Sequence, residues 1–248
     1  MLPVLQIGPF AIQTPLLLLL LGLWFSMSFG SRYSEVFKIN SKSLDDLILY
    51  SILAGLVGGR LFYIVRFPTA FLENPTSILS LNPELFLAPG ALLVGAVAFL
   101  VILQRKEMKL WQTLDALTLP TTFFLIFLGL SHLASGKVYG LPTNLPWAIQ
   151  LWGADRHPTQ VYEILGSGIV LGLTWYRFQS TIKTDSIQQS HGKFFLYFLA
   201  WISLSWILIE PLRADSVFIA GNLRLIQVIA FVFLVFSFWF QRQINKLS

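Results

Sequence analysis

Long apolar runs separated by short polar stretches are the dominant pattern of the chain. A helix that crosses the hydrocarbon layer of a bilayer needs about 20 mostly apolar residues. By this measure the pattern predicts seven transmembrane helices, at 9–29, 44–65, 87–103, 110–133, 160–178, 194–209 and 223–240. We therefore expect an all-α polytopic membrane protein. Residues 1–248 would form a single transmembrane helical domain, with a short outer-face segment at about 134–159.

The composition agrees with this class of protein. Charged residues make up 12% of the chain and hydrophobic residues 55%, whereas a soluble domain is about a quarter charged. Residues 1–10 contain no lysine or arginine and no cleavage pattern, so we expect the first helix to be retained. The absence of cysteine excludes disulfides and a cysteine nucleophile of the chain's own.

Basic residues are distributed unequally between alternate loops. One side carries eleven: Arg32, Lys38, Lys42, Arg105, Lys106, Lys109, Arg177, Lys183, Lys193, Arg242 and Lys246. The other carries five: Arg66, Lys137, Arg156, Arg213 and Arg224. Because the richer side is cytoplasmic in most membrane proteins, we expect the N-terminus outside and the C-terminus in the cytoplasm. The net charge of +5 is thus spread over short loops beside a membrane and does not indicate nucleic-acid binding.

Two further patterns concern helix packing and helix ends. Small residues recur at four-residue spacing, which predicts close contact between helices in lipid. They are Gly22, Ser26, Gly30, Gly55, Gly59, Ala91, Gly95, Gly168 and Gly172. Asp45, Asp46 and Asp115 lie near the predicted cytoplasmic starts of helices, where a negative charge stabilises the helix dipole. We expect these three aspartates to cap their own helices.

Ionisable residues near the outer ends of the predicted helices are informative, because they are costly in a membrane. The cations are Arg60, Lys137, Arg156 and Arg213, and the carboxylates are Glu163 and Glu210. Such a cluster would suit a phosphate-bearing ligand, since guanidinium groups match phosphate oxygens. The alternative is a set of structural ion pairs. In that case we expect Glu163 to pair with Arg60 or Arg156, and Glu210 with Arg213.

One segment is specific enough to indicate a family. Residues 156–163, RHPTQVYE, closely resemble the R-H-P-[ST]-Q-x-Y-E segment of the bacterial prolipoprotein diacylglyceryl transferases. Gly58-Gly59-Arg60 with Tyr63 resembles that family's G-G-R-x-x-Y segment. Residues 210–213, EPLR, resemble its E-F-x-R segment, and residues 7–9, IGP, resemble its opening I-G-P. The resemblance therefore extends over nearly the whole chain.

The resemblance implies a definite reaction and location. Members of this family transfer the diacylglyceryl group of phosphatidylglycerol to the lipobox cysteine of a preprolipoprotein, forming a thioether at the outer face of the bacterial cytoplasmic membrane. The implied partners are phosphatidylglycerol or another anionic phospholipid and the signal peptides of preprolipoproteins, with no cofactor and no metal. The reaction requires the thiol to lose its proton. It also requires positive charge at the departing glycerol phosphate.

Several residues expected for the chemistry are replaced in this chain. The family's H-G-G aligns with residues 90–92, GAL, so its histidine is missing. The family's G-R-x-x-N-F-x-N-G-E segment aligns with residues 128–137, where Gly129 replaces the arginine, His132 an asparagine and Lys137 the glutamate. Trp206 replaces a further arginine, and Pro15 replaces a tyrosine.

Three functional hypotheses follow. In the first, the chain is a transferase with a rebuilt site in which His132 is the catalytic base. The residues that would hold the phosphate are Arg60, Lys137, Arg156 and Arg213, and the supporting residues are His157, Gln160, Tyr162, Glu163 and Glu210. In the second, the chain binds phospholipid or lipoprotein precursor without transferring anything. The third, a small transporter, lacks the paired, interrupted helices with midplane charges that carriers use.

Overall fold

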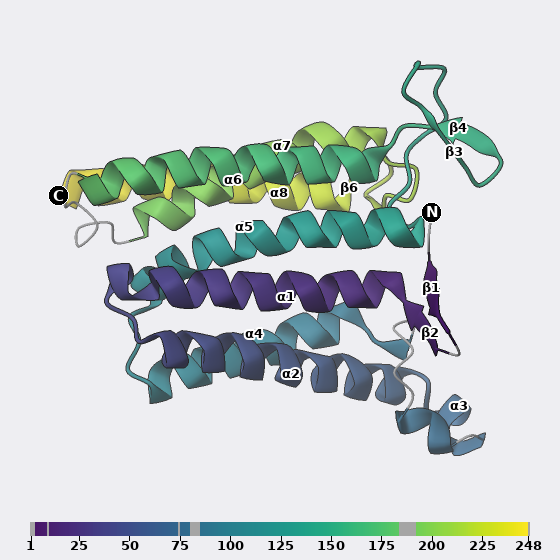
Figure 1. The fold of residues 1–248 in the computed structure, drawn as a ribbon, viewed down its shortest axis with the longest axis horizontal. Helices are drawn as coiled ribbons and strands as arrows, with labels where there is room; N and C mark the ends of the chain where they lie inside the picture. Colours follow the sequence, from purple (N-terminus) through teal and green to yellow (C-terminus); the bar gives the residue numbers. More distant parts are fainter. Residues whose placement is uncertain (1–2, 9, 74, 80–84, 184–191, 248) are drawn as a thin grey trace.

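Seven long helices form the bundle in the computed structural model, which describes residues 3–8, 10–73, 75–79, 85–183 and 192–247. Within these residues the long helices are α1 Thr14–Tyr33, α2 Ser41–Arg66, α4 Ala88–Arg105, α5 Leu110–Ser135, α6 Thr159–Lys183, α7 Lys193–Ile209 and α8 Leu225–Leu247. They run alternately in opposite directions, so the two ends of the chain lie at opposite ends of the bundle (Figure 1). The predicted all-α membrane fold is confirmed, and each predicted span coincides with one helix. Pro9, where the first span was predicted to begin, lies outside the described residues.

Six of these helices, all except α6, are long and apolar enough to cross a membrane. Helix α6 runs the same length of the bundle beside α5 and α7 (Figure 1). On its side toward the protein, Thr159, Gln160, Ser167 and Thr174 are all buried, whereas Leu165 and Ile169 are exposed on its outer side. The side of a helix that other helices cover can carry polar residues where a lipid-facing side cannot. The more polar composition of α6 therefore follows from its position in the bundle.

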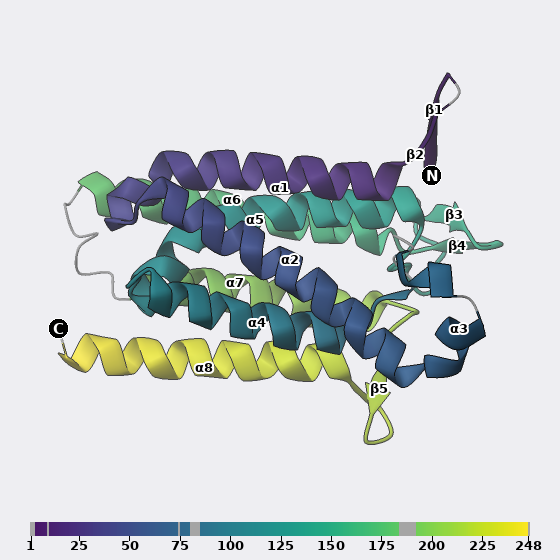
Figure 2. The same cartoon turned by 90° about the horizontal axis from the view of Figure 1, so that it is seen from below.

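Short elements gather at the end of the bundle that lies opposite the C-terminus (Figures 1 and 2). They include three antiparallel hairpins, which the all-helical prediction did not contain: β1 Val4–Ile7 with β2 Phe10–Gln13, β3 Ile149–Leu151 with β4 Ala154–Arg156, and β5 Phe218–Ile219 with β6 Leu223–Arg224. The short helices α3 Pro68–Glu73 and η2 Pro75–Leu79 lie at the same end. We call this the hairpin end. In the predicted orientation it is the outer end.

Small residues allow close packing in one part of the bundle and not in another. A Cβ atom added to Gly55 of α2 would lie 3.0 Å from the carbonyl oxygen of Ala91 in α4, so only glycine permits this approach. The predicted close approach is thus confirmed for the small residues of these two helices, and the structure shows that they face each other. In α6, by contrast, nothing lies within 4 Å of a Cβ added to Gly168 or Gly172. The prediction of a packing stripe there is wrong, because these glycines face open space.

The end opposite the hairpins is fixed by a buried aromatic and aliphatic cluster. Phe37, in the short helix η1 Ser34–Phe37, stacks on Phe178 of α6 and Phe194 of α7. Leu44 and Leu47 of α2 are fully buried in the same cluster. In a membrane bundle such side chains stabilise the contact through close van der Waals packing. The cluster therefore ties four separate parts of the chain together at this end.

Asp115 of α5 is fully buried, and its carboxylate caps a neighbouring helix. Its two oxygens accept the backbone N–H groups of Gly192 at 2.9 Å and Phe195 at 2.8 Å. Gly192 is the N-cap residue of α7 and Phe195 lies in its first turn, where the backbone N–H groups have no acceptor carbonyl within their own helix. Asp115 therefore stabilises the start of α7 and not the start of α5.

The other two aspartates also act between helices. Asp45 accepts a hydrogen bond from the Ser31 hydroxyl of α1, and Asp46 pairs with Lys106 at 2.6 Å. The side chain that caps α2 is Asn40, whose Oδ1 accepts the N–H of Ser43 at 3.2 Å. The prediction that these aspartates cap their own helices is wrong, since interhelical partners lie within reach of each.

Replacing Asp115 with alanine should destabilise the bundle. Two buried backbone donors would lose their acceptor, at a cost of about 1–3 kcal/mol for each unsatisfied group. Thermal unfolding in detergent should show a clearly lowered midpoint. Asp46→Ala is the matched control, because the partly exposed pair of Asp46 with Lys106 should contribute at most about 1 kcal/mol. Equal effects of the two substitutions would contradict the capping role of Asp115.

The orientation of the bundle remains a prediction and can be tested with introduced cysteines, since the chain contains none. Asn144, at the hairpin end, and Glu35, at the opposite end, are both exposed. In intact cells, a membrane-impermeant maleimide should label Asn144→Cys and should label Glu35→Cys only after the membrane is broken. The reverse pattern would place the hairpin end in the cytoplasm.

Candidate active site

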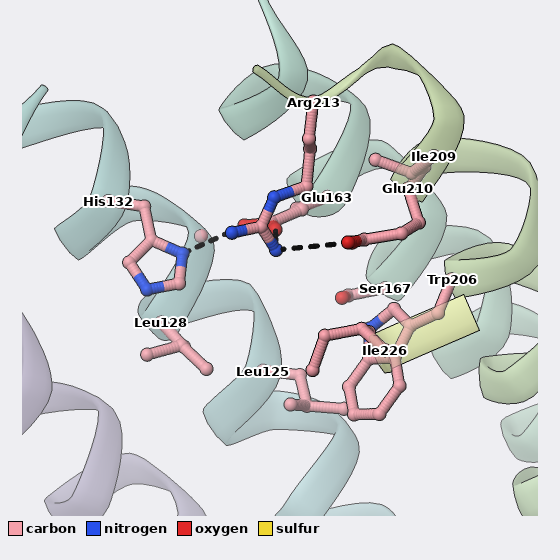
Figure 3. A pocket seen from close by; sticks show the side chains of 11 residues that line it. Leu125, Leu128, His132, Glu163, Ser167, Trp206, Ile209, Glu210, Arg213 and Ile226 are labelled. Atoms are coloured by element: carbon pink, nitrogen blue, oxygen red, sulfur yellow. Dashed lines mark hydrogen bonds and ion pairs between the residues drawn. The ribbon is translucent and has the colours of Figure 1, made fainter. Parts of the chain in front are cut away.

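A cavity of about 150 Å³ lies at the hairpin end, between α5, α6, α7 and α8. One side of it is polar and the other apolar, as Figure 3 shows. The polar side consists of His132, Glu163, Ser167, Glu210 and Arg213, and the apolar residues are Leu125, Leu128, Trp206, Ile209 and Ile226, with Gly129 between. We call this space the ionic cavity.

Glu163 is the centre of the polar side. Its Oε2 atom lies 2.8 Å from Nδ1 of His132, and its Oε1 atom lies 3.8 Å from the guanidinium of Arg213. A carboxylate can only accept hydrogen bonds, so the Nδ1–H group of the imidazole donates to it. This bond leaves the other ring nitrogen, Nε2, able to accept a proton. The pair has the composition of a general base held by a carboxylate.

Arg213 follows the short helix η5 Glu210–Leu212 and is surrounded by carboxylates. Asp215 binds it twice, with distances of 3.0 Å to Nε and 3.2 Å to the terminal nitrogen Nη2. Glu210 lies 3.5 Å from the remaining nitrogen. Burial lowers the pKa of the Arg213 guanidinium, but the hydrogen bonds and charge of Asp215, with the charges of Glu210 and Glu163, outweigh it and raise the pKa. Arg213 thus stays charged and is already paired.

The positive charge in the lining of the ionic cavity is therefore already balanced by carboxylates. Its lining includes two carboxylates, Glu163 and Glu210, and a single guanidinium, that of Arg213. Asp215 adds a third carboxylate just outside. A phosphate group in this cavity would compete with three anions for Arg213, which makes the cavity a poor phosphate site by itself.

A second cavity, of about 420 Å³, lies between α1, α5 and the N-terminal hairpin. We call it the hairpin cavity; its lining is Pro3, Val4, Gln13, Pro15, Leu19, Leu128, Ser131, His132, Ser135 and Lys137. His132 and Leu128 line both cavities. The second ring nitrogen of His132 points away from Glu163 (Figure 3). His132 and Lys137 both line the hairpin cavity.

The RHPTQVYE segment, residues 156–163, mainly anchors backbone. Arg156 donates to the carbonyls of Leu151 at 2.9 Å and Gly140 at 3.2 Å, and its guanidinium lies 5.1 Å from the centre of the Tyr139 ring. The side chains of two buried residues that follow in the segment bind the same region. Thr159 donates to the carbonyl of Val138 at 2.6 Å, and Gln160 donates to that of Lys137 at 2.9 Å. These bonds fix the chain after α5 against the start of α6.

The remaining predicted site residues lie away from both cavities. His157 is 3.5 Å from the hydroxyl of Tyr162, which accepts the indole N–H of Trp147 at 2.8 Å. Arg60 of α2 donates to the carbonyls of Leu85, at 2.9 Å, and Ser77. Its guanidinium lies 5.4 Å from each of two phenylalanine rings, those of Phe71 and Phe86. Arg60 therefore holds the loop around η2, and the cluster predicted from sequence is split.

The ion-pair alternative is half correct. Glu210 pairs with Arg213, as that alternative predicts, but Glu163 pairs with His132 and Arg213 and not with Arg60 or Arg156. Two residues that help to arrange the site were not predicted from the sequence. Asp215, which binds Arg213, lies two residues after it in the chain. Ser131 donates a hydrogen bond to the carbonyl of Pro15 at 3.0 Å and so joins α5 to α1. An acid so close to Arg213 in sequence was a usable signal, whereas the backbone contact of Ser131 left none.

Comparison with known proteins agrees with this arrangement. The profile of the prolipoprotein diacylglyceryl transferase family matches residues 3–241. Proteins named phosphatidylglycerol–prolipoprotein diacylglyceryl transferase are similar to this chain. That of Bordetella parapertussis is 32% identical over 69% of each chain, and that of Rhodospirillum rubrum is 30% identical over 84% of this chain and 78% of the relative. The protein of Synechococcus elongatus is 25% identical over 94% of this chain and 83% of its own length.

The match covers the first six long helices, most of α8 and both cavities, and the names of these relatives agree with the family's description. The chain therefore belongs to the prolipoprotein diacylglyceryl transferase family.

Proposed function

We propose that this protein transfers the diacylglyceryl group of phosphatidylglycerol to the cysteine thiol of a prolipoprotein, at the outer face of the bacterial cytoplasmic membrane. Family membership supports the reaction, and the position of both cavities at the hairpin end supports the location. In the reaction the thiol sulfur bonds to the glyceryl carbon as the bond from that carbon to the phosphate oxygen breaks. The electron pair of the broken bond leaves with glycerol phosphate, and the thiol proton passes to a base.

The observation that carries the proposal is the 2.8 Å bond between His132 and Glu163. It holds the imidazole in one tautomer and leaves Nε2 free, in a residue that lines both cavities. A nitrogen in this state can take the proton of a thiol, and Glu163 stabilises the imidazolium that results. We assign His132 as the general base and Glu163 as the residue that positions it.

Lys137 is the cation best placed for the departing phosphate. It is exposed and lines the hairpin cavity together with His132. Gln160 donates a hydrogen bond to the backbone carbonyl of Lys137, so the backbone of this residue is fixed. Its exposed side chain can still extend toward a phosphate in the cavity. A lysine ammonium is a common phosphate ligand that acts as a point charge. Arg60, Arg156 and Arg213 are engaged by carbonyls or carboxylates and contribute to the framework of the site.

The replaced arginines are consistent with a rebuilt site. A Cβ atom at Gly129 would lie 2.8 Å from Cγ1 of Ile164 and 3.3 Å from its backbone nitrogen, so a side chain at that position would require α6 to shift. Trp206, at the second lost arginine, fills the apolar side of the ionic cavity. The contact of Gly129 with α6 and the side chain of Trp206 thus take the places of two cations. His132 and Lys137, which follow Gly129 in the chain, supply basic groups instead.

The direct test is a transfer reaction with the purified protein, phosphatidylglycerol and a peptide that carries a lipobox cysteine. Mass spectrometry should detect the diacylglyceryl thioether. If folded protein binds phosphatidylglycerol and forms no thioether with any such peptide, the protein is a binder that has lost the activity.

Substituting His132 with alanine should lower kcat/KM for transfer by a factor of about 100 or more, because a positioned base typically contributes that much. Glu163→Gln should lower the rate less, since the imidazole remains but loses its carboxylate. Both rates come from the same thioether measurement. Full activity of the folded His132→Ala protein would show that another group accepts the thiol proton.

Substituting Lys137 with glutamine should lower kcat/KM by about tenfold to a hundredfold, since one preorganised positive charge at the departing phosphate is lost. Lys137→Arg should retain much of the activity because it retains the charge. Lys38→Gln is the matched control: it removes the same charge at the opposite end of the bundle, where Lys38 is exposed. Equal activity of the two glutamine variants would remove Lys137 from the site.

A further inference from the structure

The β5–β6 hairpin, which joins α7 to α8, carries an apolar surface that the rest of the protein leaves uncovered. Val217, Phe218 and Leu223 are 60%, 52% and 54% exposed, and Ile219 is 36% exposed. Phe218 pairs with Arg224 and Ile219 with Leu223, so exposed apolar side chains lie on both faces of the hairpin. A two-stranded hairpin is at best marginally stable in water, and an exposed apolar surface of this kind marks an interaction site.

The charged residues beside this surface turn away from it. Residues 216–223 include no charged side chain. Asp215, which precedes them, binds the guanidinium of Arg213. Arg224, which follows them, donates to the backbone carbonyls of Glu210 at 2.9 Å and Arg213 at 2.7 Å. Polar contacts thus fasten the base of the hairpin to the bundle, and its tip is left uncharged.

The direction of the hairpin indicates what covers its tip. It projects sideways from the bundle, across the direction of the helices, beside the start of α8 (Figure 2). The β3–β4 hairpin, by contrast, extends beyond the ends of the helices (Figures 1 and 2). The β5–β6 hairpin leads directly into α8, a candidate membrane span whose exposed side carries Phe231, Val232 and Val235. Its apolar surface therefore continues the lipid-facing surface of α8.

We propose that the β5–β6 hairpin is a membrane anchor, with its tip, residues 217–223, at the boundary between the headgroups and the acyl chains. In water the apolar side chains would stay uncovered. Deeper in the hydrocarbon, the backbone groups of the turn, where Ala220 and Gly221 both have positive φ, would lack partners. Apolar segments at the boundary bury about 5–10 Å deep, which meets both requirements. The anchor does not depend on the proposed transfer reaction.

A fluorescent probe at a single introduced cysteine tests the position of the tip, since the chain contains no other cysteine. In full-length protein reconstituted into phosphatidylcholine vesicles, a nitrobenzoxadiazole probe on Ile219→Cys should show blue-shifted emission. Lipids spin-labelled near the top of the acyl chain should quench it more than lipids labelled at the chain end. Gln150→Cys, an exposed position in the β3–β4 hairpin, is the matched control and should show the emission of a probe in water.

Three results would overturn the anchor. The first is water-like emission from position 219 without quenching by lipid. The second is strongest quenching by the label at the chain end, which would place the tip in the hydrocarbon. The third is a blue shift that appears only when a lipobox peptide is added or when the protein concentration is raised, which would assign the surface to a peptide or to a second copy of this chain.

Variants test whether the apolar side chains hold the tip in place. With the probe on Val217→Cys, adding Ile219→Asp and Leu223→Asp should return the emission toward that of a probe in water, because carboxylates are costly in a membrane. Gln150→Asp in the same labelled protein is the control and should leave the emission unchanged. The thermal unfolding midpoint in detergent checks folding, and the Ile219→Cys measurement decides the proposal if the doubly acidic variant does not fold. Unchanged lipid quenching in the folded variant would overturn the anchor.

Discussion

The arrangement of the hairpin end depends on one constraint: a carboxylate largely removed from water at the membrane end of a helix bundle must be paired. Glu163 is the clearest case. It joins His132 of α5 and Arg213 beyond α7 to its own helix, α6. Because an unpaired charge in this setting is costly, these three parts of the chain are held at a fixed spacing. The ionic cavity lies between them and therefore has a defined shape before any ligand enters.

The same constraint divides the family's segment between two tasks. Arg156, Thr159 and Gln160 point to backbone carbonyls of the chain that follows α5, and they fix this stretch to the start of α6. Glu163, one turn further along, points to the ionic cavity. A run of eight residues that is specific enough to indicate a family is thus mostly a framework. Its contribution to chemistry is to set the position of Glu163, and through it the position of His132.

The sequence predicts the helices well and the pairing of side chains poorly, for a physical reason. Apolar length decides whether a segment can cross a membrane, and it is a local property that each segment shows by itself. Which carboxylate meets which cation depends on helix rotation and on loop geometry, which no single segment contains. Arg60 and Arg156 have the same charge and lie near the same predicted depth, yet backbone carbonyls bind both. Asp115 likewise gives no sign that its partners lie about 80 residues away in the chain.

The substitutions within the site are consistent with one another. Gly129 and Trp206, which we predict from the sequence to stand where the family has arginines, both line the ionic cavity, so its wall carries no positive charge at these two positions. The carboxylates Glu163 and Glu210 remain. His132 now supplies the donor that Glu163 requires, and Arg213 is shared between Glu210, Glu163 and Asp215. One carboxylate oxygen, Oε1 of Glu210, is left over. With two carboxylates and one already paired guanidinium in its lining, the ionic cavity favours hydrogen-bond donors over anions. Lys137, for which the described residues show no ion pair, lines the hairpin cavity together with His132. The two cavities thus differ in charge, and the hairpin cavity is the one that suits a phosphate.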